Sequence, residues 1–509
     1  MSVLDGRGTP PVAPLDEHNR VLIERVRPSG WRNPSPRGRY NLVVMGAGTA
    51  GLVAAAGAAG LGARVALVER GLLGGDCLNY GCVPSKALLR CARAAADARA
   101  AGQFGVRIAG GVSVDFAAVM ERMRRLRAGL SAHDSASRFR DLGVDVFLGE
   151  GRFTGPERIE VGGAQLAFDR ALIATGGRPV VPTVEGLAGA GFLTNETVFS
   201  LTALPARLAV VGGGPIGCEL AQAFVRFGAR VTLVEQGARI LPCDDPDAAE
   251  IVRVALALEG VDLRLGQELA RVEAAPAGHR CVVHASDAFE VDAILVAAGR
   301  TAVVEGLGLE AAGVAHDGDR GIRVDDKLRT SNPKIYAAGD VVAGARRFTH
   351  VADAHARVIL RNALFPGARK ASTLTVPWCT FTDPEVAHVG LGPEAAHEAG
   401  IELRTLTQSL EGVDRAVLDG ETQGFARVHT RKRGGEILGA TIVARHAGEM
   451  ISEITLAIEA GAGLSALSST IHPYPTRGEA LRKIGDTYER ARLTPRVRWL
   501  LAKWFAWRR

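Results

Sequence analysis

Two stretches of the chain repeat the same order of hydrophobic and polar positions. In the first, the apolar run 40–45 leads into the glycine motif GAGTAG, an alanine-rich segment and a second apolar run that ends at Glu69. In the second, the apolar run 208–211 leads into GGGPIG, another helix-compatible segment and an apolar run that ends at Glu235. The acid follows the first glycine of its motif by 23 residues in both copies, and the copies lie 166 positions apart. Two such units predict two dinucleotide-binding sites.

Each glycine of the first motif has a separate task in such a unit. Gly46 makes the tight turn after the strand, Gly48 lets the backbone approach a pyrophosphate, and Gly51 lets the helix pack on the strand. Glu69 would then bind ribose hydroxyls. The competing interpretation is a strand-to-helix turn that merely needs small residues, but identical spacing in two copies argues against it.

The remaining pattern predicts further elements around these units. FDRALIATGGRP and VDAILVAAGR each indicate a strand that enters a glycine turn, and SNPKIYAAGD places Asp340 at the end of another short strand. From about residue 374, two strand-like stretches and a helix-compatible stretch predict an α+β domain. The fold class is therefore α/β, with two Rossmann-like dinucleotide-binding domains and a C-terminal α+β domain.

The expected domain boundaries follow from these elements. We expect an extension and linker at 1–39, with one helix-compatible run, LDEHNRVLIERV. The other predicted parts are a first dinucleotide-binding domain in two pieces (40–185 and 306–372), a second one (186–305), an α+β domain (373–490) and a basic aromatic tail (491–509).

A short stretch between the two units, GGDCLNYGCVPSK at 74–86, carries the candidate chemistry. Pro84, expected at the first helical position, and the run SKALLRCARAAADARA behind it predict a helix, so that Cys82 lies at or just before a helix N-terminus. Unpaired N–H groups and the helix dipole favour a thiolate there. The four residues between Cys77 and Cys82 can form one turn, which brings two cysteines within disulfide reach. This predicts a reversible dithiol/disulfide; the alternative is two packed cysteines near a glycine-rich turn.

Composition limits the class of protein. The 509 residues are 47% hydrophobic with 62 glycines, which excludes disordered and collagen-like chains. Seven cysteines are too few for a secreted disulfide framework, and we find neither a signal-peptide pattern nor an apolar stretch of membrane-spanning length, so we expect a cytoplasmic protein. A net charge of +6, from 61 basic and 55 acidic residues, gives no reason to expect nucleic acid.

The basic excess gathers in the tail RVRWLLAKWFAWRR, where Arg and Lys alternate with Trp, Phe and Leu. This pattern is compatible with an amphipathic helix. Two interpretations stay open: a weak membrane-surface contact, peripheral at the inner membrane face, and a docked or frayed tail without a membrane role.

With these motifs in hand, the chain resembles the flavin-dependent pyridine nucleotide-disulfide oxidoreductases, the family of glutathione reductase, dihydrolipoamide dehydrogenase and mercuric reductase. The resemblance runs from about residue 40 to about residue 493. GCVPSK, ELAQAF and FTDPEVAHVGL look most similar to the mercuric reductase branch.

The resemblance implies FAD at the first glycine motif and NADH or NADPH at the second. The implied cofactor-binding residues are Gly46, Gly48, Gly51, Glu69, Gly75, Lys86, Thr175, Gly176 and Asp340 for FAD, and Gly212, Gly214, Gly217, Glu235 and Gly299 around the second motif. Glu235 favours NADH, because a carboxylate accepts hydrogen bonds from a free 2′-hydroxyl and repels a 2′-phosphate. Arg239, close in sequence, keeps NADPH open as the alternative.

The resemblance also implies roles for the cysteines. Cys82 would face the flavin as the charge-transfer thiol, and Cys77 would be the interchange thiol that meets the substrate. Lys86 lies in the first turn of its helix, where a cation opposes the dipole. In the family this lysine pairs beside the flavin with an acid that matches Glu219, whereas the alternative for Glu219 is an ordinary exposed helix acid.

One departure concerns acid/base chemistry. Glutathione reductase and dihydrolipoamide dehydrogenase have a His directly before Pro-Thr and a Glu five residues later; here Tyr474 holds the His position and Glu479 the Glu position, with His472 displaced by two. A tyrosine is a poor proton acceptor at neutral pH, which disfavours rapid lipoamide or glutathione turnover. Mercuric reductases also have Tyr here. For Glu479, a capping box with Thr476 is the structural alternative.

Two further departures concern substrate and cofactor. No cysteine follows Cys379, although mercuric reductases end in a cysteine pair that delivers Hg(II), and no N-terminal CxxC domain is present. Asp76 stands where many relatives have Thr beside the FAD pyrophosphate. The resemblance also implies a homodimer. We expect an enzyme that has no resident metal and whose substrate is a disulfide, a thiol-bound metal ion or a small electrophile such as a quinone. A membrane-associated redox-sensing flavoprotein is the alternative from another class.

Overall fold

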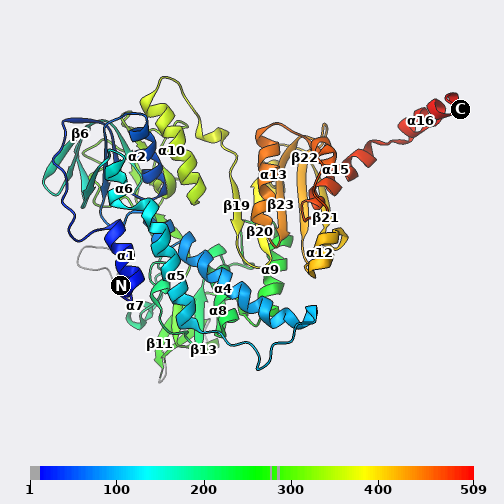
Figure 1. Cartoon of the computed structure of the whole chain (residues 1–509), viewed down its shortest axis with the longest axis horizontal. Helices are drawn as coiled ribbons and strands as arrows, with labels where there is room; N and C mark the ends of the chain where they lie inside the picture. Colours follow the sequence, from blue (N-terminus) through cyan, green and yellow to red (C-terminus); the bar gives the residue numbers. More distant parts are fainter. Residues whose placement is uncertain (1–11, 276–277, 284–286) are drawn as a thin grey trace. The chain divides into compact units, whose positions relative to one another are not determined.

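The computed structural model describes residues 12–275, 278–283 and 287–509, and divides into two compact units (Figure 1). One unit comprises the chain up to Ala238 together with Gly260–Leu374. The other comprises Arg239–Glu259 and Thr375–Arg509. The mixed helix and strand content confirms the predicted α/β class, and each unit has its own hydrophobic core.

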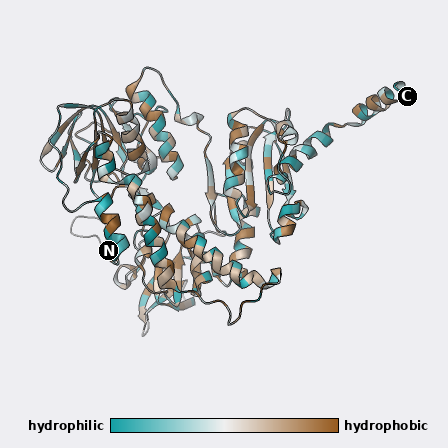
Figure 2. Ribbon diagram, viewed as in Figure 1, coloured by the Kyte–Doolittle hydropathy of each residue, from teal (hydrophilic) through white to brown (hydrophobic). Residues whose placement is uncertain are grey.

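The first unit is built around β1 (Arg39–Met45), which pairs in parallel with β2 (Val65–Glu69) on one side and β6 (Ala164–Ile173) on the other. Strands run in the order β3-β2-β1-β6-β5-β4, with β18 added beside β6. The outer strands are β3 (Asp145–Leu148), β4 (Gly151–Gly155), β5 (Arg158–Val161) and β18 (Ile335–Ala337). Because the residues of the LVVM run of β1 are buried on both faces, this strand has the continuous apolar pattern of a covered parallel sheet (Figure 2).

The helix after the first glycine motif, α2 (Thr49–Gly60), packs against α10 (Thr349–Leu364). Small residues let the two helices approach, because a Cβ atom on Gly57 would lie 2.5 Å from Cδ1 of Leu360. This contact brings the start of α10, far away in the sequence, into the same layer as the first dinucleotide-binding unit.

The second dinucleotide-binding unit consists of β8 (Arg207–Val211), α8 (Pro215–Phe227) and β9 (Arg230–Glu235), as the repeated pattern predicts. Its parallel sheet has the order β10-β9-β8-β14, with β10 at Asp262–Leu265 and β14 at Ala293–Val296. An antiparallel sheet accompanies it, formed by β11 (Leu269–Ala275), β12 (Gly278–Val283) and β13 (Asp287–Val291). Shorter elements of the first compact unit are α6 (Ala136–Asp141), β7 (Gly177–Pro179), α7 (Leu187–Ala190), β15 (Arg300–Ala302), β16 (His316–Asp317) and β17 (Gly321–Ile322).

The predicted N-terminal extension contains a packed helix. The helix-compatible run forms α1 (Glu17–Val26), whose Leu22 and Val26 are fully buried. Asn19 is also fully buried and accepts a 2.7 Å hydrogen bond from the guanidinium of Arg127 in α5 (Phe116–Leu130). Trp31, in the expected linker, donates to the carbonyl of Val146. This segment is therefore part of the core of its unit.

The second compact unit, Arg239–Glu259 with Thr375–Arg509, has a five-stranded antiparallel sheet in the order β19-β20-β23-β22-β21. The strands are β19 (Pro377–Thr380), β20 (Glu385–Gly390), β21 (Leu403–Ser409), β22 (Phe425–Arg431) and β23 (Ile437–Ala444). Its helices are α9 (Pro246–Leu258), α11 (Pro393–Glu398), α12 (Asp414–Asp419), α13 (Ala447–Glu459), α14 (Leu464–Ser469), α15 (Glu479–Arg492) and α16 (Pro495–Trp507). In the part of the chain that the structure describes, every helix is too short or too polar to cross a bilayer.

Candidate active site

The two candidate redox cysteines lie on consecutive helices. Cys77 is in the short α3 (Gly75–Asn79), and Cys82 is the first residue of α4 (Cys82–Ala100). The prediction that Cys82 lies at a helix N-terminus is confirmed, although Pro84 is the third helical residue and not the first. The turn between the helices is closely packed at Gly81, where a Cβ atom would lie 2.9 Å from a carboxylate oxygen of Asp76 and 3.0 Å from its backbone oxygen.

The surroundings of the two thiols separate their acidities. Both cysteines are free thiols; Cys82 is exposed and Cys77 is partly buried. A hydrogen bond from Cys77, the hydroxyl of Thr349 at 3.3 Å and the charge of Lys86 together lower the pKa of Cys82 to about 6, although surrounding protein atoms partly desolvate its sulfur, which acts in the opposite direction. The same hydrogen bond to Cys82, followed by burial, raises the pKa of Cys77. At neutral pH the pair therefore holds a thiolate at Cys82 and a proton at Cys77.

Lys86, a cation in the first turn of its helix, forms an ion pair with Glu219. Its ammonium lies 2.7 Å from a carboxylate oxygen of Glu219, whose side chain is only 6% exposed. Glu219 comes from α8, which packs directly against α4. The alternative of an exposed helix acid is wrong for Glu219. The pair connects the cysteine helix to the helix of the second glycine motif, and a buried carboxylate of this kind depends on its cation.

Close backbone packing explains the glycines of the first motif. A Cβ atom on Gly46 would lie 2.3 Å from the carbonyl oxygen of Ala174, and one on Gly51 would lie 1.8 Å from the carbonyl oxygen of Gly46. A Cβ atom on Gly75 would lie 2.6 Å from the Cα atom of Gly48, so the cysteine loop and the motif are in backbone contact.

The second motif repeats this arrangement. A Cβ atom on Gly212 would lie 2.5 Å from the carbonyl oxygen of Ala297, and one on Gly217 would lie 1.9 Å from the carbonyl oxygen of Gly212. The first turns of α2 and α8 have no side-chain cap at Gly48 and Gly214, which leaves N–H groups aimed at the space where a phosphate would bind. The residues present therefore fit a dinucleotide at each motif.

The two strand-end acids make the same contacts in both units. Glu69 accepts 2.6 Å hydrogen bonds from the backbone N–H groups of Ala47 and Gly71. Glu235 accepts from the N–H groups at the equivalent positions, also at 2.6 Å: Gly213 and Gly237. Burial raises the pKa of Glu69. Each acid thus fastens its glycine loop to the strand end, and ribose binding by these acids stays a prediction.

The acid at position 76 is compensated by residues that the sequence analysis did not identify. Asn195 donates a 3.0 Å hydrogen bond to Asp76, and the largely buried guanidinium of Arg300 lies 3.5 Å from it. Arg300 also lies 3.5 Å from Asp340, whose pKa burial raises. One arginine thus balances two acids that would otherwise repel a phosphate.

The other residues implied by the resemblance lie on turns near this cluster. Thr175 donates a 2.8 Å hydrogen bond to the carbonyl of Val303. Gly176 and Gly299 have φ values of 72° and 114°, in the left-handed region that glycine tolerates. Their roles in cofactor binding stay predictions.

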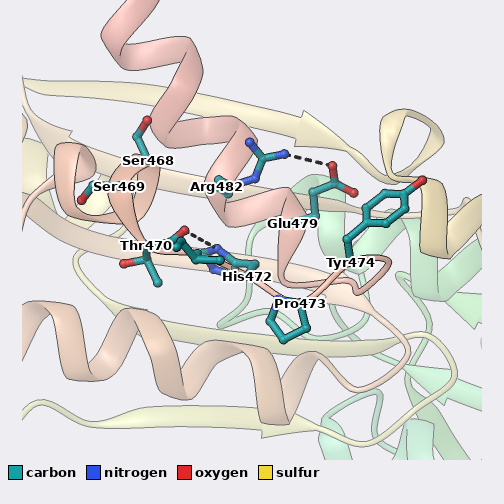
Figure 3. Close-up of a pocket in the computed structure, with 9 residues that line it drawn as sticks. Ser468, Ser469, Thr470, His472, Pro473, Tyr474, Glu479 and Arg482 are labelled. Carbon is teal, nitrogen blue, oxygen red and sulfur yellow. Dashed lines mark hydrogen bonds and ion pairs between the residues drawn. The ribbon is translucent and has the colours of Figure 1, made fainter.

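In the second unit, Tyr474 and Glu479 line a pocket of about 340 Å³ (Figure 3). The Tyr474 side chain is exposed, and its hydroxyl points away from Glu479 and donates a 2.9 Å hydrogen bond to Asp414. That hydrogen bond raises the pKa of Tyr474. Displaced His472 lies in the same pocket and is hydrogen-bonded through its two ring nitrogens to Glu453 and to the carbonyl of Thr470.

The capping-box alternative for Glu479 is wrong. Helix α15 begins at Glu479 itself, and the Thr476 hydroxyl donates to the carbonyl of Pro473 and does not cap the helix. Glu479 is buried; one carboxylate oxygen lies 3.1 Å from Arg482 and 3.4 Å from Lys483, and the other has no hydrogen-bond partner among the described residues. A buried acid with an unsatisfied oxygen is suited to a functional role.

Comparisons with known proteins cover nearly the whole chain. The family model described as pyridine nucleotide-disulphide oxidoreductase matches residues 40–356, and the model of its dimerisation domain matches residues 376–484. A mercuric reductase of Lysinibacillus sphaericus is 36% identical over 94% of this chain and 88% of its own length. A dihydrolipoyl dehydrogenase of Chlamydia muridarum is 35% identical over 86% of this chain and 95% of its own length.

A solved structure, the Cu(II) complex of the HOCl-induced flavoprotein disulfide reductase RclA from Escherichia coli, is similar in fold. Its TM-score is 0.78 at 28% identity, with 87% of this chain and 98% of that chain covered.

Proposed function

Since the chain belongs to the pyridine nucleotide-disulphide oxidoreductases, as its motifs predicted, we propose that this FAD- and NAD(P)H-dependent enzyme passes electrons from NADH through Cys77 and Cys82 to a soft metal ion held by small thiols. FAD, when bound, carries the electron pair of the hydride from the nicotinamide to the cysteine pair. The family's dimerisation domain makes the enzyme a homodimer. The remaining steps depend on residues of this chain.

The residues that would hold FAD are those around the first glycine motif. The uncapped start of α2 offers N–H groups to the pyrophosphate, and the contact between Gly48 and Gly75 keeps the cysteine loop beside that site. Lys86, fixed by Glu219, supplies a positive charge one helical turn from Cys82. This charge keeps the reduced pair in its thiolate form, ready to bind an acceptor.

The observation that carries the metal proposal is the environment of Tyr474. Reduction of a disulfide substrate breaks its S–S bond and releases a thiolate. Enzymes assist that step with a general acid of pKa near 7. The hydrogen bond that the Tyr474 hydroxyl donates to Asp414 raises the pKa of Tyr474, so this residue is unsuited to the task. A thiol-bound metal ion is reduced without S–S cleavage, and its thiolate ligands leave by exchange on the metal, so this reaction depends less on a general acid at position 474.

The chemistry of the cysteine pair supports a soft ion. Thiolates select ions such as Hg(II) and Cu(I) over hard cations, and they bind only when deprotonated. With Hg(II) the overall reaction balances as Hg(SR)₂ + NADH + H⁺ → Hg(0) + 2 RSH + NAD⁺. Mercuric reductases among the relatives and the Cu(II) complex of the solved relative support the same class of acceptor.

The contacts of Glu235 support NADH over NADPH. Its carboxylate is anchored at the strand end by two backbone N–H groups, which places a fixed negative charge where a 2′-phosphate would bind. Arg239 donates to the carbonyl of Pro242 and is engaged in that contact.

Steady-state kinetics test the proposal. We expect NADH oxidation that depends on Hg(II) in excess thiol to be much faster than oxidation with lipoamide disulfide. Tyr474→His, which leaves Glu479 in place, should raise the disulfide rate relative to the metal rate, whereas the matched Tyr474→Phe should not. Wild-type turnover with the disulfide that equals or exceeds turnover with Hg(II) would refute the metal proposal and favour the disulfide reductase alternative.

A further inference from the structure

The last helix of the chain, α16 (Pro495–Trp507), is an apolar helix that no described residue covers. Thr494 caps its start by accepting a hydrogen bond from the N–H of Val497, and none of its residues is buried. Large hydrophobic side chains are nevertheless exposed along it: Val497, Trp499, Leu500, Leu501, Trp504, Phe505 and Trp507. Such a cluster on a soluble protein marks an interaction surface.

Four of these apolar residues share one face of the helix. Val497, Leu500, Leu501 and Trp504 follow the i, i+3, i+4, i+7 spacing that places side chains on one side. Figure 2 shows hydrophobic and hydrophilic residues alternating along this helix, as that spacing requires.

Basic residues flank this face. Arg496 and Lys503 are seven residues apart, so they lie on one flank of the apolar face, and Arg498 lies on the other. Arg508 and Arg509 follow, and no acid occurs after Glu489. The Lys503 ammonium lies 3.8 Å from the centre of the Trp499 ring, and Trp504 and Trp507 pack 5.3 Å apart. Basic residues that flank an apolar, tryptophan-rich face are typical of helices that lie in a membrane interface.

Length and charge decide between the candidate occupants of this face. Thirteen helical residues span about 20 Å, short of the ~30 Å hydrocarbon core, and Lys503 lies near the middle, so the helix does not cross a bilayer. A second copy of the helix would bring together two strongly basic surfaces. An anionic phospholipid surface complements both the charge and the apolar face.

We propose that α16 docks this oxidoreductase on anionic phospholipid membranes by lying in the plane of the interface. The apolar face enters the boundary between headgroups and acyl chains, and the flanking cations contact lipid phosphates. This proposal is independent of the electron acceptor, because it rests on α16 alone.

The test is vesicle co-sedimentation of the full-length holoenzyme. Phosphatidylcholine vesicles are compared with vesicles that also contain phosphatidylglycerol, at low and high salt. We expect binding to the anionic vesicles only, with release by salt and a blue shift of tryptophan fluorescence. Arg498→Gln/Lys503→Gln should weaken binding about 25-fold, at about fivefold per cation. Leu501→Ser/Trp504→Ser should also weaken it.

The control variant Lys432→Gln/Arg433→Gln removes two exposed charges from the turn between β22 and β23 and should bind like the wild type. All variants should keep the NADH oxidation rate measured without vesicles, which shows that they fold. Equal binding to both vesicle types, no binding, or unchanged binding by the α16 variants would overturn the proposal. So would a smaller oligomer in light scattering for Leu501→Ser/Trp504→Ser, which would assign the helix to contacts between copies of the chain.

Discussion

The acidity of Cys82 can be tested directly, because its neighbours act on it in known directions. Cys77 has the largest effect and, with Thr349 and Lys86, lowers the pKa of Cys82, whereas Asp76 raises it. Lys86→Met should therefore move the alkylation midpoint of Cys82 up from about pH 6, whereas Asp76→Asn should move it down.

The size of the expected change in thiolate fraction decides whether the alkylation rate or its pH midpoint should be measured. With a pKa of about 6, some 90% of Cys82 is thiolate at pH 7, compared with about 3% for an ordinary cysteine of pKa 8.5. The roughly 30-fold gain in thiolate is largely offset, because a thiolate loses about tenfold in intrinsic nucleophilicity over 2.5 pKa units. The rate at one pH therefore discriminates poorly, and the midpoint of the pH profile is the useful readout.

The assay is iodoacetamide labelling of the reduced protein between about pH 4 and 10, with the peptide of Cys82 followed by mass spectrometry. Exposed Cys243 serves as an internal control for reagent and pH. A wild-type midpoint above about 8 would refute the assignment of Cys82 as a stabilised thiolate. Shifts of the same sign in Lys86→Met and Asp76→Asn would refute the electrostatic explanation.

Three further predictions test the cofactor sites and the N-terminal segment. Gly51→Ala places a Cβ atom 1.8 Å from a carbonyl oxygen of its own motif, so the purified variant should lack the flavin absorbance of the wild type. Gly217→Ala creates the equivalent clash at 1.9 Å, and should keep its flavin but resist reduction in an anaerobic NADH titration. Leu22→Ala should lower the free energy of unfolding by about 2–5 kcal/mol in denaturant titrations, whereas exposed Leu15→Ala should change it by less than about 0.5 kcal/mol. Bound flavin in Gly51→Ala, normal reduction of Gly217→Ala, or equal stability of the two leucine variants would contradict these expectations.

The features that could be predicted from the sequence are those that local patterns encode. Both strand–glycine–helix units follow from apolar runs and glycine spacing, since a strand that turns tightly into a helix requires glycine at fixed positions. The position of Cys82 at a helix start follows from the helix-forming run behind it. Lys86 and Glu219 were paired only through the family resemblance, because 133 residues separate them.

The features that could not be predicted are contacts between distant segments. Thr349 reaches Cys82 across 267 positions, and Asn195 reaches Asp76 across 119. No local pattern distinguishes these polar residues from others on loops and helix ends. The unusual acid at Asp76 was itself the available signal, because a charge beside a phosphate site requires a compensating cation, which turned out to be Arg300.

The cysteine pair and the tyrosine site together favour one kind of acceptor. In the first unit, neighbouring groups keep one thiolate and one proton on the pair at neutral pH, so a metal ion that binds both sulfurs displaces a single proton. In the second unit, the residue at the family's acid/base position is held by Asp414 in its protonated form. A disulfide acceptor would depend on proton transfer where this chain has an unsuitable group, whereas a soft metal ion depends on thiolate, which Lys86, Thr349 and the helix start supply. The group at the acid/base position, more than the fold, therefore distinguishes the proposed metal reductase from the disulfide reductases that share its architecture.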